Sequence, residues 1–339
     1  MKKLFYDIGE FMYRRPTECS SEVDFSANEV ELACKDPIFR EKISIASPAL
    51  VEMMDIYMKT PEQLSDKKLI GLNISIMKYL ARSKERTTPF GLFSGVGIGC
   101  FSENEKFPYL KVKNEKKINV DSEWLFGLIE HMEKCYMERL EFKFNDACHI
   151  KGNRVALIYS TEKEAEEISI RFTKVFKVLF DTIKDFTKYE VILKRLQLQY
   201  PGTSIEKIKA YVGELIEKGF LISNLRPSFN STEPLTYFIQ QCQTMEITEI
   251  SEKVIEIERL CEEYMKTDFG TGTVKYNEIK RKMQEIYKSS AYLQVDTIIN
   301  GEDFQLEKNI SESICELASL FVYLSNCLLY TSDAADDTP

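Results

Sequence analysis

Several features that would define a function are scarce in this sequence. It has two histidines, His131 and His149, and its nine cysteines include no pair in C-x-x-C spacing. A zinc site therefore has few natural ligands, and we expect reduced, mostly buried thiols in a cytosolic protein. No run of 18 apolar residues occurs, and no apolar segment follows the basic residues at the N-terminus. We expect neither a membrane span nor a signal peptide.

An excess of positive charge is also absent. The 45 Lys and Arg residues are outnumbered by 54 Asp and Glu residues, which gives a formal net charge of −9. Overall attraction to nucleic acid is excluded, so any RNA contact has to use a local basic patch. The chain does have 44% hydrophobic and 12% aromatic residues among its 339. This is enough for a large core and roughly two domains, and it argues against disorder over most of the chain.

Hydrophobic periodicity predicts an α+β fold, with mixed sheets and flanking helices. Ser47, Asp121 and Ser204 are the expected N-caps, with Glu206 near the capping-box position of Ser204, and Gly219 is an expected C-cap. The expected helices are residues 49–58, 62–84, 123–137, 174–186, 187–200, 204–218, 235–265, 273–289 and 309–326. The expected strands are residues 92–101, 107–120, 141–150, 154–160, 167–172, 220–223 and 291–298.

Glycines alternate with Val, Ile and Phe between Gly91 and Phe101. A nucleotide-binding loop would need a strand before the glycines and a helix after them, and this run leads into no helix. We interpret it as a strand against which other groups pack closely.

The densest group of polar residues follows the helix predicted at 62–84. Arg82 and Arg86 are four residues apart, so on a helix they share one face, and Thr88 comes just past its end. Two guanidinium groups on one face can hold a phosphate or a carboxylate. From spacing alone, a solvated basic helix end that is favoured by the helix dipole remains the alternative.

The same residues carry a family resemblance. Residues 82–96 contain the string R-xxx-R-x-TPFGLF-x-GV, which resembles the signature of class I lantibiotic dehydratases. The further matches, in the order that the family shows, are residues 11–16 (F-x-x-R-x-P), residues 40–50 ending in ASPAL, Asp121 with Trp124, residues 219–223 followed by 225–227, and residues 294–296 (QVD). An ordered set of this kind is far more specific than a single motif.

This resemblance implies a glutamylation domain, which moves glutamate from glutamyl-tRNA onto Ser or Thr hydroxyls of a precursor peptide. A separate, later domain would then eliminate glutamate to leave dehydroamino acids. Arg14 is a weaker candidate for substrate binding. The residues that match positions tied to the glutamylation site are Arg82, Arg86, Thr88, Asp121 and Asp296.

The resemblance also implies roles for these residues. Arg82 and Arg86 would hold the 3′-end phosphate of the tRNA or the glutamyl carboxylate. Thr88 would donate a hydrogen bond at the helix end. Asp121 or Asp296 would recognise the glutamyl ammonium group or help to deprotonate the hydroxyl.

The resemblance further suggests how the chain is organised. Residues 1–164 would begin the glutamylation domain, and residues 227–326 would continue it. Residues 165–226 have the order of a winged helix, and the family implies that this inserted module binds the leader of the precursor peptide as an added strand. A packing module without a ligand is the alternative for this segment.

Other expectations concern partners and location. No bound cofactor is expected, because glutamyl-tRNA is a co-substrate. A cyclase and a transporter of the same pathway are candidate partners, and a homodimer is a candidate assembly. The expected location is the cytoplasm, with the inner face of the membrane as a candidate peripheral site reached through a complex.

The last residues, 327–339, are unlike the rest. They resemble the translation of a sequencing adapter read through at the end of a contig, and a disordered acidic tail is the alternative. On the first interpretation the natural chain continues beyond Asn326, and the polypeptide is expected to be inactive alone. A non-catalytic leader-binding module and a winged-helix regulator stay open as functions, and neither needs the residues of the expected glutamylation site.

Overall fold

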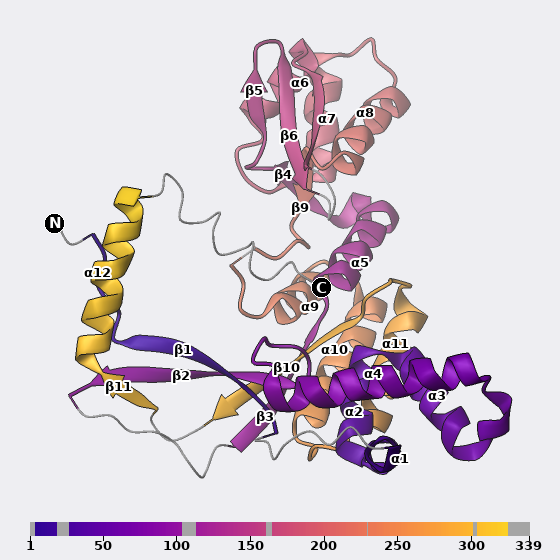
Figure 1. Cartoon of the computed structure of the whole chain (residues 1–339). Coiled ribbons are helices and arrows are strands. Elements are labelled where there is room, and N and C mark those ends of the chain that lie inside the picture. The colour runs from indigo at the N-terminus through magenta and orange to yellow at the C-terminus, as the bar shows by residue number, and fades with distance from the viewer. Residues whose placement is uncertain are drawn as a thin grey trace. The chain divides into compact units, whose positions relative to one another are not determined.

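The computed structural model describes residues 4–18, 27–103, 113–160, 165–228, 230–300 and 304–324 (Figure 1). The segment 327–339, expected to be adapter-like, lies outside these residues. The chain divides into two compact units. Unit 1 comprises residues 1–119, 261–277 and 294–339, and unit 2 comprises residues 120–260 and 278–293.

A mixed sheet runs through unit 1. Its strands are β1 (Glu10–Pro16), β2 (Ser94–Ser102), β3 (Lys113–Val120), β10 (Leu293–Asn300) and β11 (Gln305–Glu307). The order is β1-β2-β10-β3, and β11 also pairs with β2. β1 runs antiparallel to β2, whereas β10 and β11 run parallel to it. The predicted α+β class with mixed sheets is confirmed.

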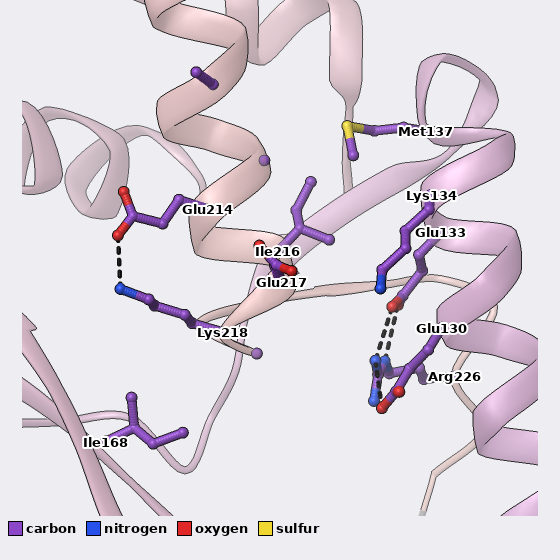
Figure 2. A pocket seen from close by; sticks show the side chains of 13 residues that line it. Glu130, Glu133, Lys134, Met137, Ile168, Glu214, Ile216, Glu217, Lys218 and Arg226 are labelled. Atoms are coloured by element: carbon purple, nitrogen blue, oxygen red, sulfur yellow. Dashed lines mark hydrogen bonds and ion pairs between the residues drawn. The ribbon is translucent and has the colours of Figure 1, made fainter.

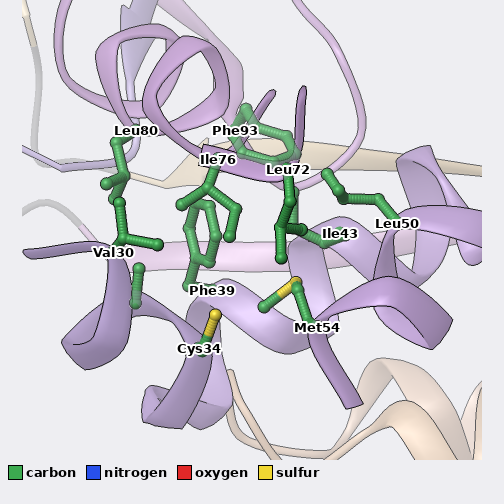
Figure 3. Close-up of a cluster of buried hydrophobic side chains, with 11 residues drawn as sticks. Val30, Cys34, Phe39, Ile43, Leu50, Met54, Leu72, Ile76, Leu80 and Phe93 are labelled. Carbon is green, nitrogen blue, oxygen red and sulfur yellow. The ribbon is translucent and has the colours of Figure 1, made fainter. Parts of the chain in front are cut away.

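The helices of unit 1 bury one apolar core between them (Figure 3). They are α1 (Ala27–Lys35), α2 (Pro37–Ala46), α3 (Pro48–Lys59), α4 (Asp66–Glu85) and α12 (Lys308–Leu324), with a short 3-10 turn η1 (Pro61–Gln63). Of these, α1 to α4 surround the core. Leu72, Ile76 and Leu80 recur every four residues of α4, so they share its buried face. They pack on Phe39 and Phe93, which fixes α4 over the start of β2.

Local chemistry explains where these helices begin and end. Asp36 caps α2, because its carboxylate accepts from the N–H groups of Ile38 at 3.0 Å and Phe39 at 3.2 Å. Ser47 is the N-cap residue of α3 and Pro48 occupies its first turn, as expected, but the Ser47 side chain makes no capping hydrogen bond. α4 ends at Glu85, and Arg86 is already extended.

Unit 2 contains two small antiparallel sheets, of order β8-β4-β9 and β5-β6-β7. The strands are β4 (Glu141–Phe144), β5 (His149–Lys151), β6 (Arg154–Ser160), β7 (Ala165–Arg171), β8 (Thr187–Lys188) and β9 (Leu221–Ser223). The remaining helices are α5 (Ser122–Cys135), η2 (Met137–Arg139), α6 (Lys174–Thr182), α7 (Tyr189–Gln199), α8 (Ile205–Glu217), α9 (Pro234–Thr244), α10 (Thr248–Met265) and α11 (Thr273–Ile286). The last residues of α10 and the first residues of α11 belong to unit 1.

Four details of unit 2 correct the sequence-based expectations. The segment expected to be helical at 235–265 is two helices, α9 and α10, and the helix expected from residue 187 begins at Tyr189, after the short strand β8. The single strand predicted at 141–150 is two strands in different sheets, because Asn145 accepts from the Ala147 N–H at 3.0 Å and forms a turn. Ser204 makes no side-chain capping bond, so the capping box with Glu206 does not form. Gly219 does adopt the left-handed conformation expected after a helix, with φ of 73°.

The helices α6 to α8 and strand β9 occur in the predicted order. The assignment of 165–226 as a winged helix, and the domain boundaries at 164, 226 and 326, remain predictions.

Candidate functional site

The first candidate site lies along the last turns of α4. Arg86 closes the helix, and its N–H donates to the Arg82 carbonyl at 3.2 Å. Arg82 is half-buried and Arg86 is exposed. The guanidinium carbon of Arg82 lies 4.1 Å from the centre of the Phe90 ring, a cation–π contact that holds this side chain over the ring.

The positive charges of Arg82 and Arg86 at this helix end are not neutralised by a carboxylate among the described residues. Burial lowers the pKa of Arg82, and the nearby charge of Arg86 lowers it further. The buried Nε of Arg82 has no hydrogen-bond partner within the described residues. By contrast, the neighbouring Lys84 is paired with Glu29 at 3.2 Å. The two arginines therefore keep their charge available for a ligand.

An open pocket of about 770 Å³ follows the same face of the helix. It is lined by Ser75, Lys78, Tyr79, Ala81, Arg82, Glu85, Arg86 and Phe90. We refer to it as the α4 pocket. The structure thus confirms that Arg82 and Arg86 share one face. Sequence reasoning missed Lys78, although its position four residues before Arg82 was a usable signal.

Thr88 and Asp296 are both connected to the start of β2. The Ser94 hydroxyl donates to the Thr88 carbonyl. Asp296 precedes Thr297, which pairs with Gly95 in the register of β10 and β2. The Thr297 hydroxyl also donates to the Gly91 carbonyl at 3.1 Å, which ties β10 to the loop that follows Thr88. Within unit 1, the structure therefore brings these two predicted residues to the same end of β2.

The carboxylate of Asp296 accepts from the Gln294 side-chain amide at 3.0 Å. Arg14 lies on β1 opposite Val96, and Ile298 lies opposite Val96 on the other side of β2. Residues two apart on a strand point to the same face, so Arg14 and Asp296 share one face of the sheet. Arg14 is exposed there.

Asp121 belongs to unit 2. It is the N-cap of α5, as predicted, and accepts from the Glu123 N–H at 2.8 Å. This cap gives Asp121 a structural role that is independent of any chemistry. Its expected role at a glutamylation site stays a prediction.

The glycine run is a strand with close packing, as the sequence predicted. A Cβ atom added to Gly97 would lie under 3.0 Å from the Tyr13 ring, and one on Gly99 would lie under 3.0 Å from the Phe11 ring. These aromatic rings of β1 lie close to the backbone of β2 because no glycine side chain intervenes. The glycines therefore serve the packing of the sheet.

A second pocket, of about 600 Å³, lies in unit 2 between α5, α8 and β7 (Figure 2). We refer to it as the α5–α8 pocket. Arg226 donates to both carboxylate oxygens of Glu133, each at 2.8 Å, and Lys218 pairs with Glu214 at 2.6 Å. Glu133 also accepts from the Ser223 N–H at 3.3 Å. Nothing in the sequence pattern around Glu133 pointed to this pair.

The described residues give no support for a metal site. They contain no group of three or more His, Cys, Asp or Glu side chains placed to hold an ion. The exposed His131 lies 3.6 Å from the Cys135 sulfur, one helical turn further along α5. Likewise, none of the helices in the described ranges has the length and apolar character of a membrane span.

Comparison with known proteins settles the family. The family described as "Lantibiotic dehydratase, N terminus" matches residues 35–335. This chain belongs to the lantibiotic dehydratase family. The resemblance carried by residues 82–96 and the other motifs is thereby confirmed.

Two relatives show the extent of the match. Subtilin biosynthesis protein SpaB of Bacillus subtilis is 36% identical over 98% of this chain, which covers 33% of SpaB. Nisin biosynthesis protein NisB of Lactococcus lactis subsp. lactis is 32% identical over 80% of this chain, which covers 28% of NisB. The chain therefore spans about a third of the length of the curated relatives that it matches.

Solved structures share the fold. The tRNA dependent lantibiotic dehydratase MibB from Microbispora sp. 107891 matches 91% of this chain with a TM-score of 0.73 and 19% identity, over 30% of its own length. The glutamylation domain of TbtB, from thiomuracin biosynthesis, matches 83% with a TM-score of 0.55 and 18% identity, over 35% of that chain.

Proposed function

We propose that this chain is the part of a lantibiotic dehydratase that positions glutamyl-tRNA and a precursor peptide for transfer of glutamate to Ser or Thr. The observation that carries the proposal is the α4 pocket. Its cations Arg82 and Arg86 lack carboxylate partners within the described residues, in a chain of net charge −9. Cations held in this way suit a phosphate or a carboxylate. The tRNA dependence and glutamylation named for MibB and TbtB support the same conclusion.

The chemistry suits the residues at the start of β2. In the transfer, the hydroxyl oxygen of Ser or Thr attacks the glutamyl carbonyl carbon, and the ester bond to the tRNA ribose breaks. The proton of the attacking hydroxyl passes to the released ribose oxygen. One ester replaces another, so the reaction depends on positioning, worth about 7–11 kcal/mol at best, and on stabilising the oxyanion.

Each candidate residue has a place in this scheme. Arg82 and Arg86 hold the phosphate at the tRNA 3′ end or the glutamyl carboxylate. Thr88 donates a hydrogen bond, and Asp296 or Asp121 recognises the glutamyl ammonium group or receives the hydroxyl proton. A later elimination of glutamate would yield the dehydroamino acid.

The α5–α8 pocket supports binding of the leader peptide in unit 2. Strand β7 ends the order β5-β6-β7, so among the described strands its outer edge has no partner. Ile168 of β7 lines the pocket together with Gly213 and Glu217 on the side of α8. An extended peptide can add to such an edge and place its side chains in the adjacent groove. The winged-helix-like segment 165–226 would then act as the leader-binding module.

The proposal requires two partners, the precursor peptide and glutamyl-tRNA, and it needs no bound cofactor. It places the protein in the cytoplasm, where charged tRNA is available. A cyclase, a transporter, a second copy of the chain and attachment to the membrane surface through a complex remain expectations. A leader-binding module without catalysis is the alternative function, supported by the α5–α8 pocket alone.

A chimera tests the proposal. This chain replaces the matching third of SpaB, and the chimera is incubated with the subtilin precursor, tRNA, glutamate and a glutamyl-tRNA synthetase. We expect mass spectrometry to show glutamylated and dehydrated precursor for the chimera, and an Arg86→Ala chimera to form these products about a hundredfold more slowly. Binding of the leader peptide should be unchanged in the variant. Wild-type rates in the Arg86→Ala chimera would leave only the leader-binding alternative.

A further inference from the structure

Helix α4 carries a third cation on the face that holds the two arginines. Lys78 lies one turn before Arg82, which lies one turn before Arg86, and all three line the α4 pocket. At a rise of 1.5 Å per residue, successive members of this row are about 6 Å apart along the helix, and the whole row is about 12 Å long. Glu85 is the one carboxylate among the residues that line the pocket.

The position of Lys78 has no structural explanation within the helix. Its neighbours three and four residues away on the helix surface are Ile74, Ser75, Ala81 and Arg82, and none of them can neutralise it. Lys78 is exposed and makes no ion pair within the described part of the chain. The helix dipole favours cations only in the last turn, whereas Lys78 lies seven residues before the end of α4.

A row of this length fits an extended polyanion better than a single anion. One carboxylate or one phosphate can contact two adjacent members of the row, but it cannot span about 12 Å. A single-stranded nucleic-acid backbone offers one phosphate for each nucleotide, so it can meet the row at successive points. An ammonium group acts on such a phosphate as a point charge, with no demand on its orientation.

We propose that Lys78 binds a backbone phosphate of the tRNA acceptor end, further from the aminoacyl ester than the phosphate held by Arg82 and Arg86. This inference rests on the proposed function. The direction of the RNA along the row follows from the structure. Arg86 is the member of the row nearest in sequence to Thr88, whose carbonyl accepts a hydrogen bond from Ser94 of β2. Lys78 is therefore a binding and positioning residue, remote from the reacting atoms.

The test measures binding of fluorescently labelled glutamate tRNA, without an attached amino acid, to the whole chain at increasing KCl concentration. We expect Lys78→Gln to weaken binding three- to tenfold at low salt. The slope of log affinity against log salt should fall by about 0.7, the value for one phosphate contact on a single strand. Lys78→Arg should restore both. Lys67→Gln is the matched control, because it removes the same charge from an exposed site in the first turn of α4.

The SpaB chimera supplies the second measurement. There we expect Lys78→Gln to raise the KM for glutamyl-tRNA with kcat unchanged, whereas Arg86→Ala lowers kcat. If Lys78→Gln and Lys67→Gln behave alike while Arg86→Ala abolishes glutamylation, the inference for Lys78 is wrong and the proposed function stands. If Arg86→Ala has no effect either, the proposed function itself fails. The inference is also overturned if Lys78→Gln weakens binding of an acidic leader peptide and leaves binding of tRNA unchanged.

Discussion

The two pockets differ in how their charges are paired. In the α4 pocket of unit 1, the guanidinium of Arg82 rests on Phe90 and has no carboxylate partner within the described residues. In the α5–α8 pocket of unit 2, Arg226 and Glu133 form a bidentate ion pair, and Lys218 forms an ion pair with Glu214. Both pockets lie at the C-terminal end of a helix.

This difference separates unpaired cations, which can bind a ligand, from paired charges, which stabilise the fold. The carboxylate of Glu133 is almost fully buried, with 4% of the side chain exposed, so its charge is tolerated only because Arg226 and the Ser223 N–H satisfy it. The cations of the α4 pocket are exposed or half-buried, so water can solvate them until a ligand arrives. Removing a charge from the α5–α8 pocket should cost stability, and removing one from the α4 pocket should cost function.

The largest expected effect on stability is that of Glu133→Ala. The change removes the buried carboxylate that accepts from Arg226 and from the Ser223 N–H in unit 2. Losing one partner of a fully buried pair costs about 3–5 kcal/mol, and because 22% of the Arg226 side chain is exposed we expect about 2–3 kcal/mol. Urea denaturation followed by circular dichroism measures the loss.

Glu130→Ala is the matched control for this change. Glu130 lies 3.8 Å from the same arginine, but 52% of its side chain is exposed, so we expect a change within about 0.5 kcal/mol. Equal losses in the two variants would show that the Glu133 pair is no more structural than a surface contact, and the contrast between the pockets would disappear.

A smaller effect on stability is expected for Arg82→Ala. The variant loses a cation–π contact worth about 0.5–1 kcal/mol at an exposed site, but it also removes the repulsion from Arg86. We expect the free energy of unfolding to change by about 0.5 kcal/mol or less, while glutamylation by the SpaB chimera falls about a hundredfold. A loss of stability as large as that of Glu133→Ala would instead assign Arg82 to the core of unit 1.

Sequence patterns predicted the parts of the site that depend on local spacing. The four-residue separation of Arg82 and Arg86, the end of α4 before Pro89 and the close packing at Gly97 follow from helix periodicity, proline geometry and the missing Cβ. The Asp121 cap is equally local. The helices α1 and α2 were missed because short helices have weak periodic signals.

The parts that depend on tertiary contacts were not predictable from one sequence. Glu133 and Arg226 are 93 residues apart, and no local pattern connects them. The turn at Asn145 was hidden inside a segment with strand-like alternation. The connection of Asp296 to Thr88 passes through the register of β10 on β2, which only the folded sheet defines.

The smallest expected effect is on the alkylation rate of a thiol in unit 1 when Glu133 of unit 2 is replaced. It tests whether the loss of the Glu133 ion pair destabilises unit 2 alone. Cys34 of unit 1 and Cys242 of unit 2 are both buried, and burial raises the pKa of the Cys34 thiol to about 11 and that of Cys242 to about 12. At pH 8 a thiol of pKa 11 is about a hundredfold less ionised than one of pKa 9, so both should alkylate slowly with iodoacetamide, far behind the exposed Cys135.

In Glu133→Ala, Cys242 should react roughly 30- to 150-fold faster, the factor that about 2–3 kcal/mol represents. Cys34 should keep its wild-type rate, and peptide mass spectrometry resolves the two sites. A parallel rise at Cys34 would mean that the two units unfold together, and that the paired charges of one pocket also support the site in the other unit.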